Sequence, residues 1–198
     1  MSITPRMRKC SRLYAFALMV ALLLPTIARA TTYQTLSFDE LVKEADVIFV
    51  GDVVDVHPYT MNVRGRTIIR TRVTFRVSDP IYGTKSLVEV FDFLGGEAGG
   101  IGMAVEGMPK FNTGDRRVVF AHRDPSINPI VGFTQGLLRV TRDGNGVERV
   151  LSSQGRPLAG VASLAAPTLG PRMAPDASMS LADIRGRIVT ALSEARKQ

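Results

Sequence analysis

A glycine-rich block is the first set of residues in this sequence that could do chemistry. The stretch FLGGEAGGIGMAVEGMPKF, residues 93–111, holds six glycines. A phosphate-binding P-loop needs a Lys-Ser or Lys-Thr pair after its last glycine, and none follows here. The dinucleotide pattern G-x-G-x-x-G is also missing, because Val105 occupies the place of its third glycine. The block therefore predicts tight turns and close backbone approaches, for which glycine is the favoured residue.

The same block is the first candidate for a partner contact, because loops of small β-barrels are common binding surfaces. A purely structural role is the alternative. The candidate contact residues are Gly95, Gly96, Gly99, Gly100, Gly102, Met103 and Met108.

A stripe of arginines is the second set. They alternate along one face of the strand-like segment 68–79 and continue into the loop before it. The stripe could bind an anionic polymer or lipid headgroups through Arg64, Arg66, Arg70, Arg72 and Arg76. Nucleic-acid binding by such a barrel also needs aromatic side chains among the cations, and this arginine face has none, so no nucleic acid is expected. The alternative is an ordinary solvated strand face.

Catalytic and metal-binding patterns are not found in the sequence. The two histidines, His57 and His122, stand at strand ends near Asp55 and Asp124, without an H-x-x-x-H spacing. The sequence also lacks a G-x-S-x-G nucleophile elbow. We therefore expect no catalytic residue, no metal ligand and no cofactor, with a hydrolase of unrecognised site as an alternative.

The first thirty residues have the pattern of a secretory signal peptide. A basic start is followed by the apolar run 13–25 and by small residues at Ala28 and Ala30. The run is shorter than the roughly 20 residues that cross a bilayer. We expect cleavage between Ala30 and Thr31, export to the periplasm or the medium, and no stable membrane span afterwards.

The net charge of the whole chain, +7, belongs mostly to this expected export signal. Five of the 25 basic residues and none of the 18 acidic residues lie in 1–30, which leaves 31–198 with a net charge of +2. The single cysteine, Cys10, lies there too. The mature chain is therefore expected to lack thiol chemistry and disulfides, and its overall charge does not indicate a partner.

Short elements with clear boundary signals make up the rest of the chain. A capping box at Ser37 and Glu40 predicts a helix over 38–44. Gly51, inside the first long strand, predicts a bulge or a close backbone approach. The expected strands are 47–57, 68–79, 87–94 and 116–122, then PIVGF, GLLRV and VERVLS, with a hairpin turn at 143–146. A second capping box, at Ser180 and Asp183, predicts a C-terminal helix with the apolar stripe Leu181, Ile184, Ile188, Val189 and Leu192.

These elements predict a mainly β protein, a small OB-like antiparallel β-barrel with a short N-terminal helix and a C-terminal helix. The expected division is a signal peptide at 1–30, a barrel at 31–154, an Ala/Pro/Gly-rich connector at 155–179 and an amphipathic helix at 180–198.

Three stretches carry a family resemblance: FDELVKEADVIFVGDVVDV, TRVTFRVSDPIYG and GIGMAVEGMPKFNTGDRRVVFA. They resemble the tissue inhibitors of metalloproteinases and, more broadly, netrin-like domains, whose fold is a five-stranded OB barrel. The resemblance covers residues 38–121. The block 94–114 also resembles a group of exported bacterial proteins of uncharacterised function. The inhibitors chelate the zinc of their protease with an N-terminal cysteine, whereas Thr31 would begin this mature chain. The resemblance therefore implies the fold more than the inhibition.

The sequence as a whole predicts an exported, non-enzymatic binding module that contacts another exported protein. The resemblance implies a secreted protease as that partner. The first alternative is an envelope or surface factor that binds an anionic polymer through the arginine face.

Overall fold

The computed structural model describes residues 35–123, 127–164 and 178–196. Residues Gln34–Gln198 form one compact unit. The elements are α2 (Phe38–Glu44), β1 (Val47–Val63), β2 (Arg66–Tyr82), β3 (Val88–Leu94), β4 (Gly96–Ala98), β5 (Ile101–Met103), β6 (Arg116–Ala121), β7 (Leu137–Arg142), β8 (Glu148–Leu151), η1 (Val161–Leu164) and α3 (Leu181–Ala195). No helix among the described residues is long and apolar enough to cross a membrane.

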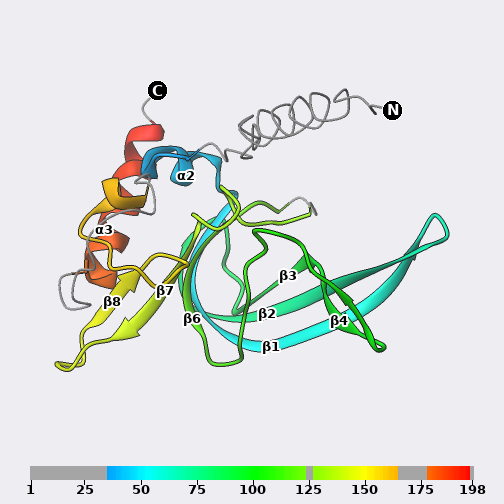
Figure 1. Ribbon diagram of the computed structural model, residues 1–198. Helices are drawn as coiled ribbons and strands as arrows, with labels where there is room; N and C mark the ends of the chain where they lie inside the picture. Colours follow the sequence, from blue (N-terminus) through cyan, green and yellow to red (C-terminus); the bar gives the residue numbers. More distant parts are fainter. Residues whose placement is uncertain (1–34, 124–126, 165–177, 197–198) are drawn as a thin grey trace, which may run out of the picture. The chain divides into compact units, whose positions relative to one another are not determined.

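The main sheet has six antiparallel strands in the order β3-β2-β1-β6-β7-β8, and β4 and β5 form a separate hairpin. Figure 1 shows the sheet strongly curled, with α2 and α3 together on one side of it. The mainly β, antiparallel prediction with a helix before and after the strands is confirmed. Among the described residues no strand pairing joins β3 to β8, so the sheet does not close. The barrel is therefore an open one.

Strand β1 lies in the interior of the main sheet, between β2 and β6, and its first residues are buried on both faces. Val47, Ile48, Phe49 and Val50 have no exposed surface. The pairing with β2 shifts register between Val50 and Gly51. A Cβ at Gly51 would lie 2.9 Å from the Arg76 carbonyl oxygen, so the expected bulge and close approach are both present.

Two clusters of buried side chains follow from this alternation among the described residues. The helix-side core joins the sheet to both helices and η1. The inner core fills the concave side of the curl with Val47, Phe49, Val53, Val73, Phe75, Val77, Phe91, Phe93, Val119, Ala121, Ile130 and Leu137.

Both helices start where the sequence predicts. Ser37 and Glu40 form the capping box of α2, and Ser180 and Asp183 form that of α3. Helix α3 buries Ile184, Ile188 and Ala191 in the helix-side core, so it packs on the sheet. Val189 was expected in the apolar stripe, but it is exposed.

Some local predictions are corrected by the structure. PIVGF is not a strand, because Ile130 forms only an isolated bridge to Ala121 and the residues after it make turns. The segment expected as a loose connector contributes Leu158 and Leu164 to the helix-side core. Residues 165–177 lie outside the described part of the chain.

The β1–β2 hairpin extends well past the rest of the sheet. Pairing of β2 with β3 stops at Arg70 and Leu94, and pairing of β1 with β6 stops at Asp52 and Arg116. Ile69 is still buried and its carbonyl oxygen accepts a hydrogen bond from Gly95. The residues beyond it, 61–68, form a two-stranded projection, here named the arm (Figure 1).

Candidate functional site

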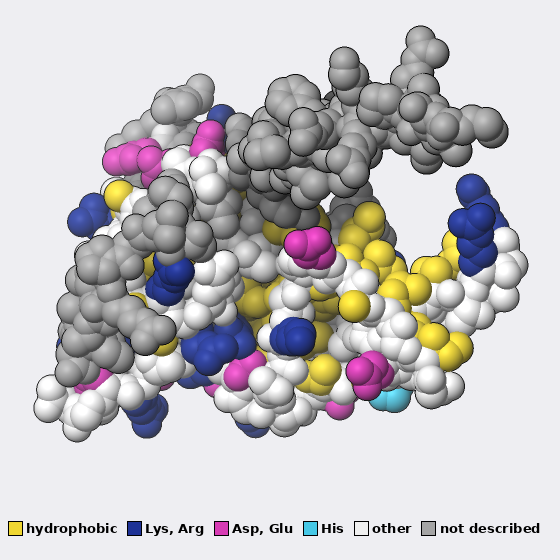
Figure 2. All heavy atoms as spheres, viewed as in Figure 1, with side chains coloured by type: hydrophobic (Ala, Val, Ile, Leu, Met, Phe, Trp, Pro, Cys, Tyr) yellow, Lys and Arg dark blue, Asp and Glu magenta, His cyan; other side chains and the backbone are white. Residues whose placement is uncertain are grey.

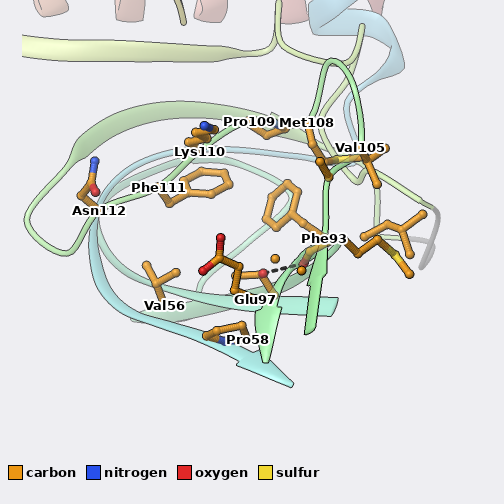
Figure 3. A pocket seen from close by; sticks show the side chains of 17 residues that line it. Val56, Pro58, Phe93, Glu97, Val105, Met108, Pro109, Lys110, Phe111 and Asn112 are labelled. Atoms are coloured by element: carbon orange, nitrogen blue, oxygen red, sulfur yellow. Dashed lines mark hydrogen bonds between the residues drawn. The ribbon is translucent and has the colours of Figure 1, made fainter. Parts of the chain in front are cut away.

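A hollow of about 870 Å³ lies between the base of the arm, the β4–β5 hairpin and the segment that leads into β6. Figure 3 shows these walls facing one another around the cavity. We name it the groove. Its volume is typical of ligand pockets, which span roughly 300–1,000 Å³. Its apolar lining residues are Val56, Pro58, Phe93, Leu94, Met103, Ala104, Val105, Met108, Pro109 and Phe111.

The floor of the groove continues the inner core. The ring centroids of Phe93 and Phe111 are 4.7 Å apart, and Phe111 also makes an edge contact with Phe75. Phe75 in turn packs against Phe49 and Phe91. Because these rings are packed on several sides, the groove has a preformed aromatic floor that does not depend on a ligand.

Two glycines shape the wall that β4 forms. Gly95 and Gly96 have positive φ angles of 99° and 125°. The Thr71 hydroxyl donates a hydrogen bond of 2.7 Å to the Gly95 carbonyl oxygen, and a Cβ at Gly96 would clash with that hydroxyl. The close backbone approach predicted from the glycine block therefore occurs here, and it holds β4 against β2.

Most of the candidate contact residues border the groove. Gly95, Gly96, Gly102, Met103 and Met108 line it. Gly99 and Gly100 instead form the turn between β4 and β5, where their φ angles are 60° and 76° and no atom lies near an added Cβ. The structure thus brings five of the seven predicted residues together at one hollow.

Polar groups in the groove are few and spread apart. Glu97 projects into it from β4, and Lys110 lies on the opposite wall (Figure 3). Thr71 and Asn112 complete the polar lining. Neither Glu97 nor Lys110 forms an ion pair within the described ranges. The groove therefore offers one anion and one cation on an otherwise apolar surface.

A buried ion pair anchors the wall that carries Phe111 and Asn112. Arg117, only 2% exposed, points to the inner side of β6 and donates a 2.6 Å hydrogen bond from Nη2 to Asp115 Oδ2. The backbone N–H of Asn112 donates to the same oxygen. Burial opposes ionisation of Asp115, but the hydrogen bonds from Arg117 and Asn112 outweigh it and hold the pKa of this carboxyl below its usual value.

The five arginines of the stripe lie in different surroundings in the structure. Arg70 donates to the Asp92 carbonyl oxygen, and Arg72 forms an ion pair of 3.1 Å with the Asp92 carboxylate, which raises the pKa of Arg72. Arg76 lies on the body of the sheet, opposite Asp52. Arg64 and Arg66 lie at the tip of the arm.

The expectation that the arginine face carries no aromatic residue is wrong. Tyr59 of β1 pairs with Arg70, and the Arg72 guanidinium carbon lies 5.2 Å from the centre of the Tyr59 ring. The segment 68–79 alone could not show this, because the ring comes from the other strand. The two-residue turn at Arg64 and Gly65 is the signal that would have given the register.

The histidines do not form a site in the structure. His57 is exposed, and His122 Nδ1 lies 3.8 Å from Asp46 Oδ2. Within the described ranges, no group of three His, Cys, Asp or Glu side chains could hold a metal ion. The predicted cleavage residues Ala28, Ala30 and Thr31 lie outside the described residues.

Comparison of the chain with family models, with curated proteins and with solved structures gave no significant match. The resemblance to the metalloproteinase inhibitors and netrin-like domains therefore stays a prediction. What the chain does has to be argued from the groove and the arm.

Proposed function

We propose that this protein is an exported, non-catalytic binding module that holds part of another exported protein in the groove. The observation that carries the proposal is the groove itself, a preformed apolar hollow of about 870 Å³ with a packed aromatic floor. Burying apolar surface is the main favourable term in protein association. An apolar segment flanked by one basic and one acidic group would complement Glu97 and Lys110.

The first partner to test is an exported protease, because the resemblance to metalloproteinase inhibitors suggests that class. The groove would receive a ridge or loop of the partner without turnover. A role for the Thr31 amine belongs to the same hypothesis.

A groove-narrowing variant tests the proposal. Gly102 has no positive φ, and a Cβ there would lie 3.7 Å from the Glu97 side chain, so Gly102→Phe adds bulk on the groove side without backbone strain. Gly144→Phe is the matched control, because it adds the same ring in open space on the β7–β8 turn.

The measurement is capture from the exported fraction with the full chain carrying a photo-crosslinking residue at Lys110, which lies on the groove wall. We expect one crosslinked partner that Gly102→Phe removes and Gly144→Phe retains. The same crosslinker at exposed Lys85, outside the groove, should capture nothing. Capture that survives Gly102→Phe, or that is equal at both positions, would show that the groove is not the binding site.

A further inference from the structure

The arm has an unusual distribution of side chains for a projection surrounded by solvent. Cross-strand partners lie on the same face of a hairpin, so the pairs Met61–Ile68 and Val63–Arg66 share one face. The pair Asn62–Thr67 lies on the other face. One face of the tip is thus aliphatic and basic, and the other is polar. Met61 and Val63 are 37% and 39% exposed, and neither belongs to a core cluster of the described residues.

The hairpin that carries this face has charges of a single sign. Residues 56–78 contain five arginines and no Asp or Glu, and the Asp92 carboxylate on the neighbouring strand pairs with Arg72, away from the tip. Arg64 and Arg66 form no ion pair within the described part of the chain. Figure 2 shows basic side chains at the end of the arm, with hydrophobic ones between them and the body.

The backbone at the apex adds an independent observation. Arg64 has φ 51° and Gly65 has φ 77°, the left-handed pair of a two-residue hairpin turn. Asn or Gly is favoured at the first of these positions, because other L residues are strained there. A strained residue that presents a cation at an apex indicates a functional contact.

We propose that the tip of the arm docks on a lipid bilayer surface that carries anionic headgroups. Arg64 and Arg66 would bind headgroup phosphates, for which the guanidinium fork is well matched. Met61, Val63 and Ile68 would enter the boundary between headgroups and acyl chains. An anionic polysaccharide would satisfy the arginines but leave these aliphatic side chains in water.

The reach of the arm suits this contact. Each strand extends three residues beyond the last flanking contact, 61–63 on β1 and 66–68 on β2, or about 10 Å at 3.3 Å per residue. Interfacial elements bury their apolar side about 5–10 Å into the headgroup region. The tip can therefore enter the interface while the groove stays in water.

A single-tryptophan reporter tests the proposal, because the chain contains no tryptophan. Val63→Trp places the reporter on the aliphatic face, and Thr67→Trp places it on the opposite face of the same turn. The full chain is mixed with phosphatidylcholine vesicles, with and without phosphatidylglycerol. Each ring reports only its own surroundings, so the apolar stretch 13–25 affects both reporters alike.

We expect a blue shift of the emission at position 63 with anionic vesicles, and no shift at position 67 or with neutral vesicles. Arg64→Gln with Arg66→Gln should lower the partition coefficient about 30-fold, since each basic residue near an anionic surface contributes about 1 kcal/mol. Lys85→Gln with Arg156→Gln removes the same charge elsewhere and should leave it unchanged. Gly102→Phe should also leave it unchanged, which separates this proposal from the groove.

Three results would overturn the proposal that the tip docks on an anionic bilayer. No shift at position 63 would show that the tip does not enter the bilayer. Equal shifts at positions 63 and 67, or with neutral vesicles, would show non-specific adsorption. A shift with soluble polyphosphate but not with vesicles would assign the tip to an anionic polymer.

Discussion

Arg117 Nη2 donates a hydrogen bond of 2.6 Å to Asp115 Oδ2, and this contact fixes the segment behind Phe111 to the inner side of β6. The Arg117 side chain is buried, and its Nε has no hydrogen-bond partner within the described residues. Removing only one member would leave a charge buried without its partner, which is strongly destabilising.

We therefore expect Asp115→Ala to lower the free energy of unfolding by about 3–5 kcal/mol in urea titrations. The double variant Asp115→Ala with Arg117→Met should lose clearly less, because it leaves no unpaired charge. Asp79→Ala is the control, since it breaks a similarly short but exposed pair with Arg185 and should cost at most about 1 kcal/mol. Equal losses for Asp115→Ala and the double variant would contradict the buried-charge argument.

The same pair predicts a pH dependence of stability. The pKa of Asp115 is lower in the folded protein than the usual value of about 3.9 for an unfolded aspartate. Its contribution is therefore complete above that unfolded value and is lost as the pH falls through the lower, folded pKa. Urea unfolding of wild type and Asp115→Asn should differ most above about pH 5 and converge in stronger acid. A difference that grows on acidification would show that the sign of the shift is wrong.

Gly96 should be much less replaceable than Gly102, another glycine of the groove. Gly96→Ala would put a methyl group against the Thr71 hydroxyl at a φ of 125°. We expect a loss of roughly 1–3 kcal/mol from the backbone conformation, and about 1 kcal/mol more if the Thr71–Gly95 hydrogen bond breaks. Gly102→Ala, also in the groove wall, should stay within about 0.5 kcal/mol of wild type in thermal or urea unfolding. Similar stabilities of the two variants would refute the close approach.

Features that depend on neighbouring residues in the chain could be predicted from the sequence. The capping boxes of α2 and α3, the alternation of β2 and the bulge at Gly51 each leave a local pattern. The prediction of a strand at PIVGF was wrong because its local pattern is ambiguous. A short apolar run looks the same whether it pairs as a strand or is buried in turns. Ile130 and Val131 are buried without belonging to a strand.

Features that depend on pairing between distant residues could not be predicted. The groove exists because β4 is held on β2 through Thr71 and Gly95, and because Phe111 packs on Phe93. The aromatic neighbour of the arginine stripe, Tyr59, comes from the other strand of the hairpin, and only the register set by the turn at Arg64 and Gly65 would have indicated it. The open barrel likewise reflects what lies at the free edge of β3, where the Leu94 backbone N–H donates to the Ile127 carbonyl oxygen and no further strand pairs among the described residues.

The apex of the arm allows stability and function to be separated by one substitution. Arg64→Asn replaces a strained residue with one that adopts the left-handed conformation readily, so it should raise the free energy of unfolding by a few tenths to about 1 kcal/mol. The same change removes a cation from the tip, so binding to anionic vesicles should fall by about fivefold at 1 kcal/mol per charge. Urea unfolding and vesicle co-sedimentation of one protein preparation measure both. If the tip had only a structural role, Arg64→Asn would raise the stability of the protein and leave its vesicle binding unchanged. Arg64→Lys keeps the cation, so it should bind vesicles like the wild type and show no gain in stability.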